Sequence, residues 1–387
     1  MTTGQRAHVN REILSWAREQ SGLTVEAAAK KLQVKPERLT SWEAGSDEPT
    51  IKQLRTLAHG YHFSFAIFFL SAPPEGYQPI RDYRRLFAAA EHELSPELTL
   101  EIRRAYDRRD IARELLGELE SEPKQWGVRI SITEDPAAAG SRLRQRLGVS
   151  DEDQASWREP AVGFREWRTS IEQAGVLVFQ AAGIDLDEMR GFSIGDGSLP
   201  AIVVNRADAY AGRCFTLLHE LTHIALHSEG LCNLHEVGLP TADAGRIEAF
   251  CNAVAGAALV PKAALLALDK VTQHEGLRWE PRELEPIARH FVVSRQVIIR
   301  RLLEADRTNQ TNFDKVMEEL EREFRSLPAR QGGFLSPPDN FLSLAGRTYA
   351  RLAMTAYREN KLSASALADI LGLRVRHFES IEQAVAT

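Results

Sequence analysis

The chain has 387 residues, with a hydrophobic content of 43% and a charged content of 26%. These values are those of an ordinary globular protein of two or three domains. The net charge of −6 at pH 7 excludes a chain coated with basic residues for nucleic acid, although it allows one local basic face. The sequence shows neither a positively charged leader with an apolar core nor an apolar run long enough to span a membrane, so we expect a cytoplasmic protein without a membrane partner.

Residues 7–70 predict a module of five short helices. The first helix spans residues 10–20, and Thr24 can cap the second helix through its side-chain oxygen. Pro36 suits the first turn of a third helix, and Pro49-Thr50 opens a further one.

This helix order, together with Trp42-Glu43-Ala44-Gly45 and Pro49-Thr50, resembles the XRE-type helix-turn-helix of phage repressors. The resemblance implies that residues 36–42 form the reading helix. The side chains that it would turn toward the groove, as candidates for DNA contact, are Lys35, Glu37, Arg38 and Ser41. Residues 1–70 hold nine Lys or Arg against seven Asp or Glu, a weak basic surplus. Because phosphate neutralisation supplies most nonspecific DNA affinity, a helix-turn-helix that serves as a protein-docking surface is the alternative.

The middle of the chain predicts helices followed by a small sheet. A long charged helix over residues 96–121 and two shorter ones over residues 136–148 and 160–174 read as a scaffold. Three β-rich runs separated by turns then predict the strands of the sheet, at residues 175–179, 191–194 and 200–204.

His219-Glu220-Leu221-Thr222-His223 is an H-E-x-x-H motif, and the run 215–226 around it has no proline or glycine. On a helix, residues i and i+4 lie one above the other, roughly 6 Å apart, which suits two imidazole nitrogens on one Zn²⁺ ion at about 2.1 Å each. Glu220 leans off that line, where it can take a proton from a water on the zinc and later return it. The short motif also arises by chance, in which case both histidines are ordinary helix residues.

A catalytic zinc usually has three protein ligands and one open position, so a third ligand is needed. Residues 246–261 predict an apolar helix that stops at a proline, and Glu248 is the only carboxylate in it. A carboxylate in a buried helix is costly unless it is paired or bound to metal, and we therefore predict Glu248 as the third ligand. The alternatives are a solvated Glu248 that complements the helix dipole, and Glu236 or Asp243 of the preceding loop as ligand.

His227 continues the line of His219 and His223. Three such positions span roughly 12 Å along a straight helix, too far for one tetrahedral ion. We predict that His227 supports a ligand from behind or faces the substrate; an ordinary helix-end histidine is the alternative. A donor to the developing oxyanion is also needed, and Arg213, Tyr210 and His227 are the candidates.

The two predicted metal helices together resemble the ImmA/IrrE metallopeptidases over about residues 165–305. The family pattern is a strand ending in V-N, then R-x-F-T-L-x-H-E-x-x-H-x-x-x-H, then E-x-x-x-N-x-x-A-x-x-L-x-P. The chain matches it at Val204-Asn205, from Arg213 to His227, and from Glu248 through Asn252 to Pro261. The resemblance implies His219, His223 and Glu248 as zinc ligands and Glu220 as the general base.

The rest of the chain predicts further helices, at residues 263–268, 284–305 with an internal turn, 304–328 and 341–383. A break is predicted over residues 330–338, and residues 362–372 look like a small helix-turn-helix unit. The three cysteines, Cys214, Cys232 and Cys251, form no C-x-x-C motif, and their odd number is typical of a reducing cytoplasm. We predict that all three are packing residues.

These observations predict an α+β fold that is mainly α, with a helical, zincin-like peptidase core around a small β-sheet. The expected parts are an XRE-like helix-turn-helix domain of five helices at residues 1–72, a helical linker or scaffold at 73–160, the zinc peptidase core at 161–305 and a helical C-terminal segment at 306–387.

The sequence thus predicts a zinc-dependent endopeptidase. The family resemblance implies that its substrate is a transcriptional repressor, cut to control stress, phage or mobile-element genes. In many zinc peptidases the edge strand before the metal helix pairs with the substrate backbone. One alternative is a regulator that binds DNA through residues 1–72 and uses its zinc site for sensing or partner contact, and another is a toxin–antitoxin-like component. An intact Glu220 favours the enzyme, because a structural zinc site has no use for it.

Overall fold

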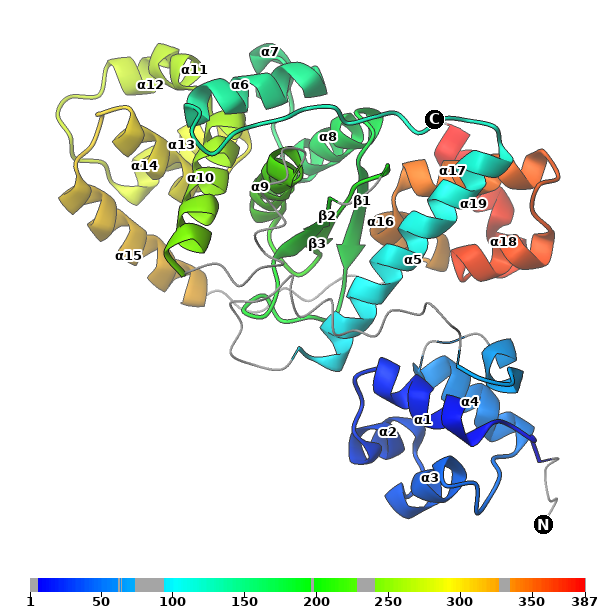
Figure 1. The fold of residues 1–387 in the computed structure, drawn as a ribbon. Coiled ribbons are helices and arrows are strands. Elements are labelled where there is room, and N and C mark those ends of the chain that lie inside the picture. Colours follow the sequence, from blue (N-terminus) through cyan, green and yellow to red (C-terminus); the bar gives the residue numbers. More distant parts are fainter. Residues whose placement is uncertain are drawn as a thin grey trace. The chain divides into compact units, whose positions relative to one another are not determined.

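The computed structural model of the chain describes residues 6–61, 63, 65–73, 94–195, 198–227, 241–326 and 335–386. These residues are mainly helical and contain one small sheet, which confirms the predicted fold class (Figure 1). The chain divides into two compact units, Met1–Arg104 and Ala105–Thr387. The four domain ranges expected from the sequence stay a prediction. Among the described residues, no helix has the length and apolar character needed to cross a membrane.

The first unit begins with four α-helices and a 3-10 helix: α1 (Arg11–Gln20), α2 (Val25–Leu32), α3 (Pro36–Glu43), α4 (Ile51–Tyr61) and η1 (Phe65–Phe69). The side chain of Asn10 accepts a hydrogen bond from the backbone N–H of Glu12, and that of Thr24 accepts one from Ala27. Both polar residues therefore cap the helices that they precede. The predicted module of five helices is present, and its fifth member is the short 3-10 helix.

The second unit is built around a three-stranded sheet in the order β1-β3-β2, with β1 at Leu177–Ala181, β2 at Gly191–Ile194 and β3 at Ala201–Asn205. β1 runs parallel to β3, and β2 runs antiparallel to it. All residues of β1 and β3 are buried, as expected for strands covered by helices. Helix α8 (Pro160–Gln173) packs against β1, and helix α9 (Tyr210–His227) packs against β2 and β3.

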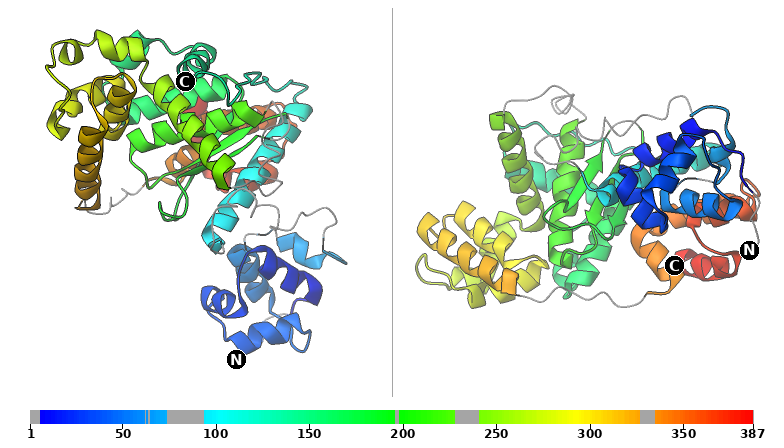
Figure 2. Two further views of the ribbon diagram at one scale, coloured as in Figure 1. Left: turned by 60° about the vertical axis from the view of Figure 1, so that its left-hand side comes forward. Right: turned by 90° about the horizontal axis from the view of Figure 1, so that it is seen from below.

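Further helices flank this centre, namely α5 (Pro96–Glu118), α6 (Pro136–Leu147), α7 (Asp151–Ser156), α10 (Thr241–Leu259), α11 (Lys262–Ala267), α12 (Asp269–Thr272), α13 (Pro281–Phe291), α14 (Arg295–Glu304) and α15 (Gln310–Ser326). The short helices α7 and α12 were not predicted. Helix α10 packs against both α6 and α9. Helices α11–α15 and the helices that follow residue 335 lie on opposite sides of the sheet in Figure 1 and in the right-hand view of Figure 2.

The C-terminal segment consists of α16 (Pro337–Ala345), α17 (Arg347–Arg358), α18 (Ala364–Leu371), η4 (Val375–His377) and α19 (Phe378–Ala386). Helix α16 begins inside the stretch that the sequence predicted as a break. The reason is local, because the Ser336 side chain accepts a hydrogen bond from the backbone N–H of Asp339, and prolines suit the first helical turn.

This segment packs on the outer edge of β1. Gln180 Nε2 of β1 donates to the Ser343 carbonyl over 2.6 Å, and Arg168 Nη1 of α8 donates to the same oxygen over 2.9 Å. Arg168 Nη2 also donates to the carbonyl of Val178 in β1, over 2.5 Å. Thr348 Oγ1 of α17 donates to Glu172 over 2.6 Å. The edge of the sheet at β1 is therefore covered, whereas β2 forms the opposite edge of the described sheet.

The close contact between α6 and α10 depends on Gly140. A Cβ atom there would lie 2.8 Å from the backbone nitrogen of Ala258, which cannot move without shifting α10. We expect Gly140→Ala to lower the free energy of unfolding by about 1–3 kcal/mol through overpacking, although alanine favours a helix. The measurement is a denaturant unfolding curve.

Gly117 in α5 provides the matched control, because a Cβ there meets nothing within 4 Å. Gly117→Ala should leave the protein as stable or raise its stability by up to about 1 kcal/mol. Equal stabilities for Gly140→Ala and Gly117→Ala would contradict the proposed contact.

Candidate metal centre

Helix α9 carries two histidines, His219 and His223, whose rings meet edge to face with their centres 4.8 Å apart. Its apolar side packs into the core, where Leu217, Leu218 and Leu221 are 0% exposed. This packing fixes the rotation of the helix and leaves His219 and His223 one turn apart on another side. The two Nε2 atoms are 3.1 Å apart.

Helix α10 brings Glu248 to the same point. Its Oε1 is 3.2 Å from His223 Nε2, and its Oε2 is 3.3 Å from His219 Nε2. The candidate ligand atoms of His219, His223 and Glu248 all lie within 4.8 Å of one another. Two ligands at about 2.1 Å from a tetrahedral ion are about 3.4 Å apart, so this triangle of two imidazoles and a carboxylate fits Zn²⁺.

Asn252 supports this cluster from behind. It follows Glu248 by one turn of α10, and its Oδ1 is 3.1 Å from Nδ1 of His219. A hydrogen bond from Nδ1–H to this oxygen fixes the tautomer of His219 and leaves the Nε2 lone pair for a metal. The sequence showed Asn252 only as part of a family pattern. The i, i+4 spacing of Glu248 and Asn252 was the signal that both lie on one helix face.

The cluster is electrostatically prepared for a cation. Burial lowers the pKa of His219, but the hydrogen bond to Glu248 and the charges of Glu220 and Glu248 outweigh it, so the pKa lies above its usual value. Hydrogen bonds from His219 and His223 hold the pKa of Glu248 far below its usual value against the effect of burial. Glu248 is therefore a carboxylate at every physiological pH.

Glu220 belongs to α9, and its side chain lies on the side of the helix that faces strand β2. Its side chain is buried, with 8% of the residue exposed. A Cβ atom added to Gly191 of β2 would lie 2.3 Å from Thr216 Cγ2 and 3.5 Å from Glu220 Cγ. The glycine thus lets the edge strand approach α9 closely, and it places this carboxylate beside β2.

The candidate oxyanion donors have other contacts in the structure. Arg213 donates to the Asp208 carbonyl over 2.8 Å and to Gln180 Oε1 over 2.7 Å, and its guanidinium stacks 4.2 Å from the ring centre of Tyr210. These contacts brace the start of α9 against β1. The side chain of His227 lies outside the described part of the structure. A donor role for any of the three stays a prediction.

The alternative ligands and the cysteines can be placed in part. Glu236 and Cys232 fall outside the described residues. Asp243 was expected in a loop, but its backbone belongs to α10. Cys214 and Cys251 are buried with 0% exposure, and burial raises the pKa of the Cys214 thiol to about 12. A thiol that stays protonated is suited to packing.

The candidate DNA-contact residues gather on α3. Lys35 precedes its first turn and is exposed, as is Arg38, whereas Ser41 is partly buried and donates to the Arg38 carbonyl over 2.7 Å. The Arg38 guanidinium lies 4.0 Å from Asp47 and 5.5 Å from the ring centre of Trp42. The exposed side of α3 is therefore accessible within this module, but an acidic side chain accompanies its arginine.

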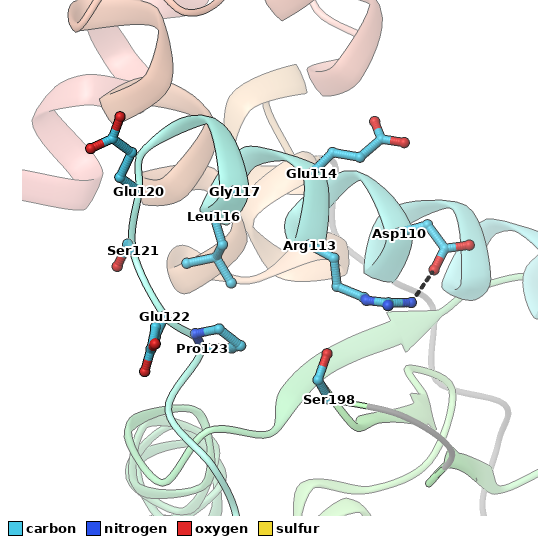
Figure 3. Close-up of a pocket in the computed structure, with 10 residues that line it drawn as sticks. All are labelled: Asp110, Arg113, Glu114, Leu116, Gly117, Glu120, Ser121, Glu122, Pro123 and Ser198. Atoms are coloured by element: carbon cyan, nitrogen blue, oxygen red, sulfur yellow. Dashed lines mark ion pairs between the residues drawn. The ribbon is translucent and has the colours of Figure 1, made fainter.

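A depression of about 750 Å³ lies at the C-terminal end of α5 (Figure 3). It is lined by α5, by the segment that follows α5 and by Ser198, which precedes β3. Arg113 and Asp110 form an ion pair of 3.6 Å on its wall. None of the residues of the metal cluster lines it, so we assign it no part in the metal chemistry.

Family comparisons agree with this geometry. Residues 171–303 match the peptidase family model described as the IrrE N-terminal-like domain, and residues 14–68 match a helix-turn-helix model. The chain therefore carries a helix-turn-helix domain followed by a peptidase-family domain of the IrrE type, which confirms the resemblance. The second of these domains contains His219, Glu220, His223 and Glu248. A comparison with curated proteins found no match.

Removal of each ligand should have a distinct effect on the metal. We expect about one zinc per chain, lost in His219→Ala and His223→Ala and strongly weakened in Glu248→Ala. Asn252→Ala should weaken binding about 10- to 100-fold, because His219 loses its orienting partner. Metal analysis and competition with a chromogenic chelator give these values.

Glu220→Gln and His8→Ala are the controls for this series. His8 is exposed, with 87% of its side chain accessible, so both variants should keep the zinc. Zinc binding by Glu248→Ala at the wild-type affinity would remove Glu248 from the ligand set.

Zinc affinity should depend on pH through His219. Zinc binds the unprotonated imidazole, and the raised pKa of His219 means that protons compete at a higher pH than for an ordinary histidine. Affinity should therefore fall as the pH decreases through that raised value, by about tenfold per pH unit for one released proton. Glu248, with its lowered pKa, should contribute nothing to this loss.

Chelator competition from about pH 8 to about pH 5 measures this dependence. In Glu248→Gln the fall should start at a lower pH, since the carboxylate that raises the pKa of His219 is gone. An affinity that stays constant over this range would contradict the ligand role of His219.

Proposed function

We propose that this protein is a zinc-dependent endopeptidase. The observation that carries the proposal is the convergence of His219, His223 and Glu248 to within 4.8 Å, with Glu220 buried one position after the first ligand. A site built only to hold a metal needs the three ligands but not a neighbouring carboxylate. Glu220 is thus the residue that distinguishes a hydrolytic centre from a sensor.

The proposed chemistry divides among five side chains. His219, His223 and Glu248 would hold the zinc, and Asn252 would keep the His219 ring in place. When bound, zinc acidifies a water in its open position and polarises the scissile carbonyl. The Glu220 carboxylate takes a proton from the attacking water and returns it to the leaving amine.

Strand β2 is the proposed docking strand for the substrate backbone. The backbone N–H of Asn205 donates to the Arg190 carbonyl, so Arg190 is hydrogen-bonded to β3. In an antiparallel pair every second residue is bonded in this way, and the next bonded residue is Phe192. Gly191 and Ser193 consequently point their backbone groups away from β3. An extended peptide that pairs there would pass beside Glu220. The other edge of the sheet is covered by Arg168 and the α16–α17 segment.

The proposed substrate is a helix-turn-helix repressor, cut to release stress, phage or mobile-element genes. The helix-turn-helix domain at residues 14–68 supports this. It would raise the effective concentration of the peptidase near its target, either through a like fold or on DNA contacted by Lys35, Arg38 and Ser41. An exposed linker between domains is the expected cut site, because a peptide must be extended to pair with an edge strand.

The competing proposals use the same metal without proteolysis. A DNA-binding regulator would employ the zinc for sensing or partner contact, and a toxin–antitoxin component would use the N-terminal module as a tether. Both predict that Glu220 is dispensable, and the enzyme proposal predicts that it is essential. The next experiment rests on that difference.

The expected activity is one or two cuts in a partner repressor, without general digestion of casein-like substrates. Wild type and Glu220→Gln are each co-expressed with a candidate repressor from a neighbouring gene. Fragments are then identified by mass spectrometry, with and without stress and added zinc. We expect a fragment with wild type only.

Glu220→Gln is the matched control because it should retain the metal and lose only the proton acceptor. A fragment that appears with both proteins comes from another protease. Absence of any fragment with either protein, across the repressors and conditions tried, would favour the regulator over the enzyme.

A further inference from the structure

The C-terminal segment repeats the layout of the N-terminal module. Helices α17, α18 and η4–α19 follow one another as α1, α2 and α3 do. Thr24 caps α2 and Ser363 caps α18, each by accepting a hydrogen bond from the backbone N–H three residues on. Both middle helices then end in a left-handed residue, Gln33 at φ 55° and Gly372 at φ 62°. The two turns into the third helix therefore have the same length and the same backbone hand.

The cores of the two modules share six buried positions, whereas Ile13 and Ala29 correspond to the half-buried Leu352 and Ala368. Each C-terminal position is the N-terminal position plus 339, as for Thr24 and Ser363. The buried pairs related in this way are Leu14 and Ala353, Ala17 and Ala356, Ala28 and Leu367, Leu32 and Leu371, Leu39 and Phe378, and Trp42 and Ile381. Matching burial along three helices indicates one fold rather than a chance likeness of one turn.

An ion pair joins the first and third helices in both modules, although its arginine is displaced by one position, because Tyr357 and not Arg358 is Arg18 plus 339. Arg18 at the end of α1 pairs with Glu43 at the end of α3, with Nε and Oε1 2.8 Å apart. Arg358 at the end of α17 pairs with Glu382 in α19. Glu382 is again Glu43 plus 339. Each pair links the third helix to the first and so fixes the orientation of the third helix, whose outer side would face a partner.

The outer side of the third helix is more basic in the C-terminal module. Lys35 corresponds to Arg374, and Glu37 corresponds to Arg376, so an acidic residue is replaced by an arginine. Arg374 and Arg376 are both exposed, and the next residue is His377.

Acidic residues near this side differ between the modules as well. In the N-terminal module Arg38 lies 4.0 Å from Asp47. In the C-terminal module the exposed acid on the same side is Glu379, one turn further along the helix. At the start of the helix, which enters a groove first, the C-terminal module carries Arg374, Arg376 and His377 where the N-terminal module carries Lys35, Glu37 and Arg38. The C-terminal module thus has two arginines and no acid at these three positions.

The anchoring of this module leaves the basic side outward. Contacts with the sheet and α8 come from α16 and the start of α17, through Ser343 and Thr348. Helix α19 packs against α16 and α17 with its buried side. Arg374 and Arg376 come just before α19, at the start of η4, and both are exposed.

We propose that residues 347–386 form a second helix-turn-helix module that binds the phosphate backbone of duplex DNA, with Arg374 and Arg376 as its main contacts. This site is separate from the metal centre and from the N-terminal module. It gives the chain two nucleic-acid contacts of unequal strength despite a net charge of −6.

The test measures the salt dependence of DNA binding by the full chain. The probe is a fluorescent duplex of mixed sequence, roughly 30 base pairs long, titrated from about 50 to about 200 mM salt. Arg374→Ala/Arg376→Ala should lower the affinity about tenfold or more at low salt. It should also flatten the slope of log affinity against log salt by about 1.8, since each phosphate contact contributes about 0.9.

Two further variants make this result specific. Arg322→Ala/Arg325→Ala removes the same charge from the exposed side of α15, where 66% and 80% of the side chains are accessible, and it should leave the slope unchanged. Lys35→Ala/Arg38→Ala should flatten the slope less than the C-terminal variant does. Thermal melts and zinc content of all variants should match wild type, because every altered side chain is on the surface.

The proposal is overturned if the wild-type chain does not bind the duplex at low salt, which would leave this module as a contact for protein. It is also overturned if Arg374→Ala/Arg376→Ala keeps the wild-type slope, or if the α15 variant flattens the slope by the same amount.

Discussion

The packing of α9 against α10 is the contact on which the metal centre depends. Neither helix can hold a metal alone, since α9 carries two imidazoles and α10 carries the carboxylate. Small and apolar residues let the helices approach, with Cys251, Ala255 and Ala258 of α10 all 0% exposed. Gly140 of α6 then supports α10 from another side. A change in the packing of α10 against α9 or against α6 would displace Glu248 by more than a metal–ligand bond tolerates.

The charged groups of the cluster lie at the edge of the core. Half of the Glu248 side chain is exposed, whereas only 15% of the His219 side chain and 10% of the His223 side chain are. Withdrawing such groups from water is costly unless they are paired and hydrogen-bonded. Here Glu248 hydrogen-bonds to both histidines, and Asn252 satisfies the other nitrogen of His219. The polar atoms are thus arranged around a position that a divalent cation can take. Their pKa shifts, upward for His219 and downward for Glu248, have this arrangement as their cause.

A second set of buried contacts links the C-terminal segment to the start of the metal helix. Gln180 of β1 donates to the Ser343 carbonyl and accepts from Arg213 of α9. Arg213 in turn holds the carbonyl of Asp208, just before α9 begins. The C-terminal segment is therefore part of the frame that positions α9, in addition to carrying the proposed second helix-turn-helix module.

The parts that sequence could predict were those encoded locally. The helix-turn-helix order, the three strands and the two histidines on one helix follow from caps, periodicity and short spacings. The role of Asn252 could not be deduced in this way, because it depends on the distance between two helices. Helix α7 has only six residues, too few for periodicity, and forms because Ser150 and Asp153 cap it reciprocally.

The pairing of the strands also could not be predicted from the sequence. The parallel pairing of β1 with β3 joins strands that β2 separates in the chain. The coverage of the β1 edge by α16 depends on contacts across more than 160 positions, as between Gln180 and Ser343. Arg213 shows the same limit. It fits a family pattern that suggests catalysis, whereas its contacts with Gln180 and Asp208 brace the fold.

The central claim, that two imidazoles of α9 and a carboxylate of α10 bind one zinc ion, is tested most directly by zinc K-edge X-ray absorption on the purified chain. The account predicts a first shell of nitrogen and oxygen only, at about 2.0–2.1 Å, with the outer scattering of two imidazole rings. His223→Ala should remove one ring from that signal. A sulfur atom at about 2.3 Å, or a wild-type spectrum with fewer than two imidazoles, would contradict it.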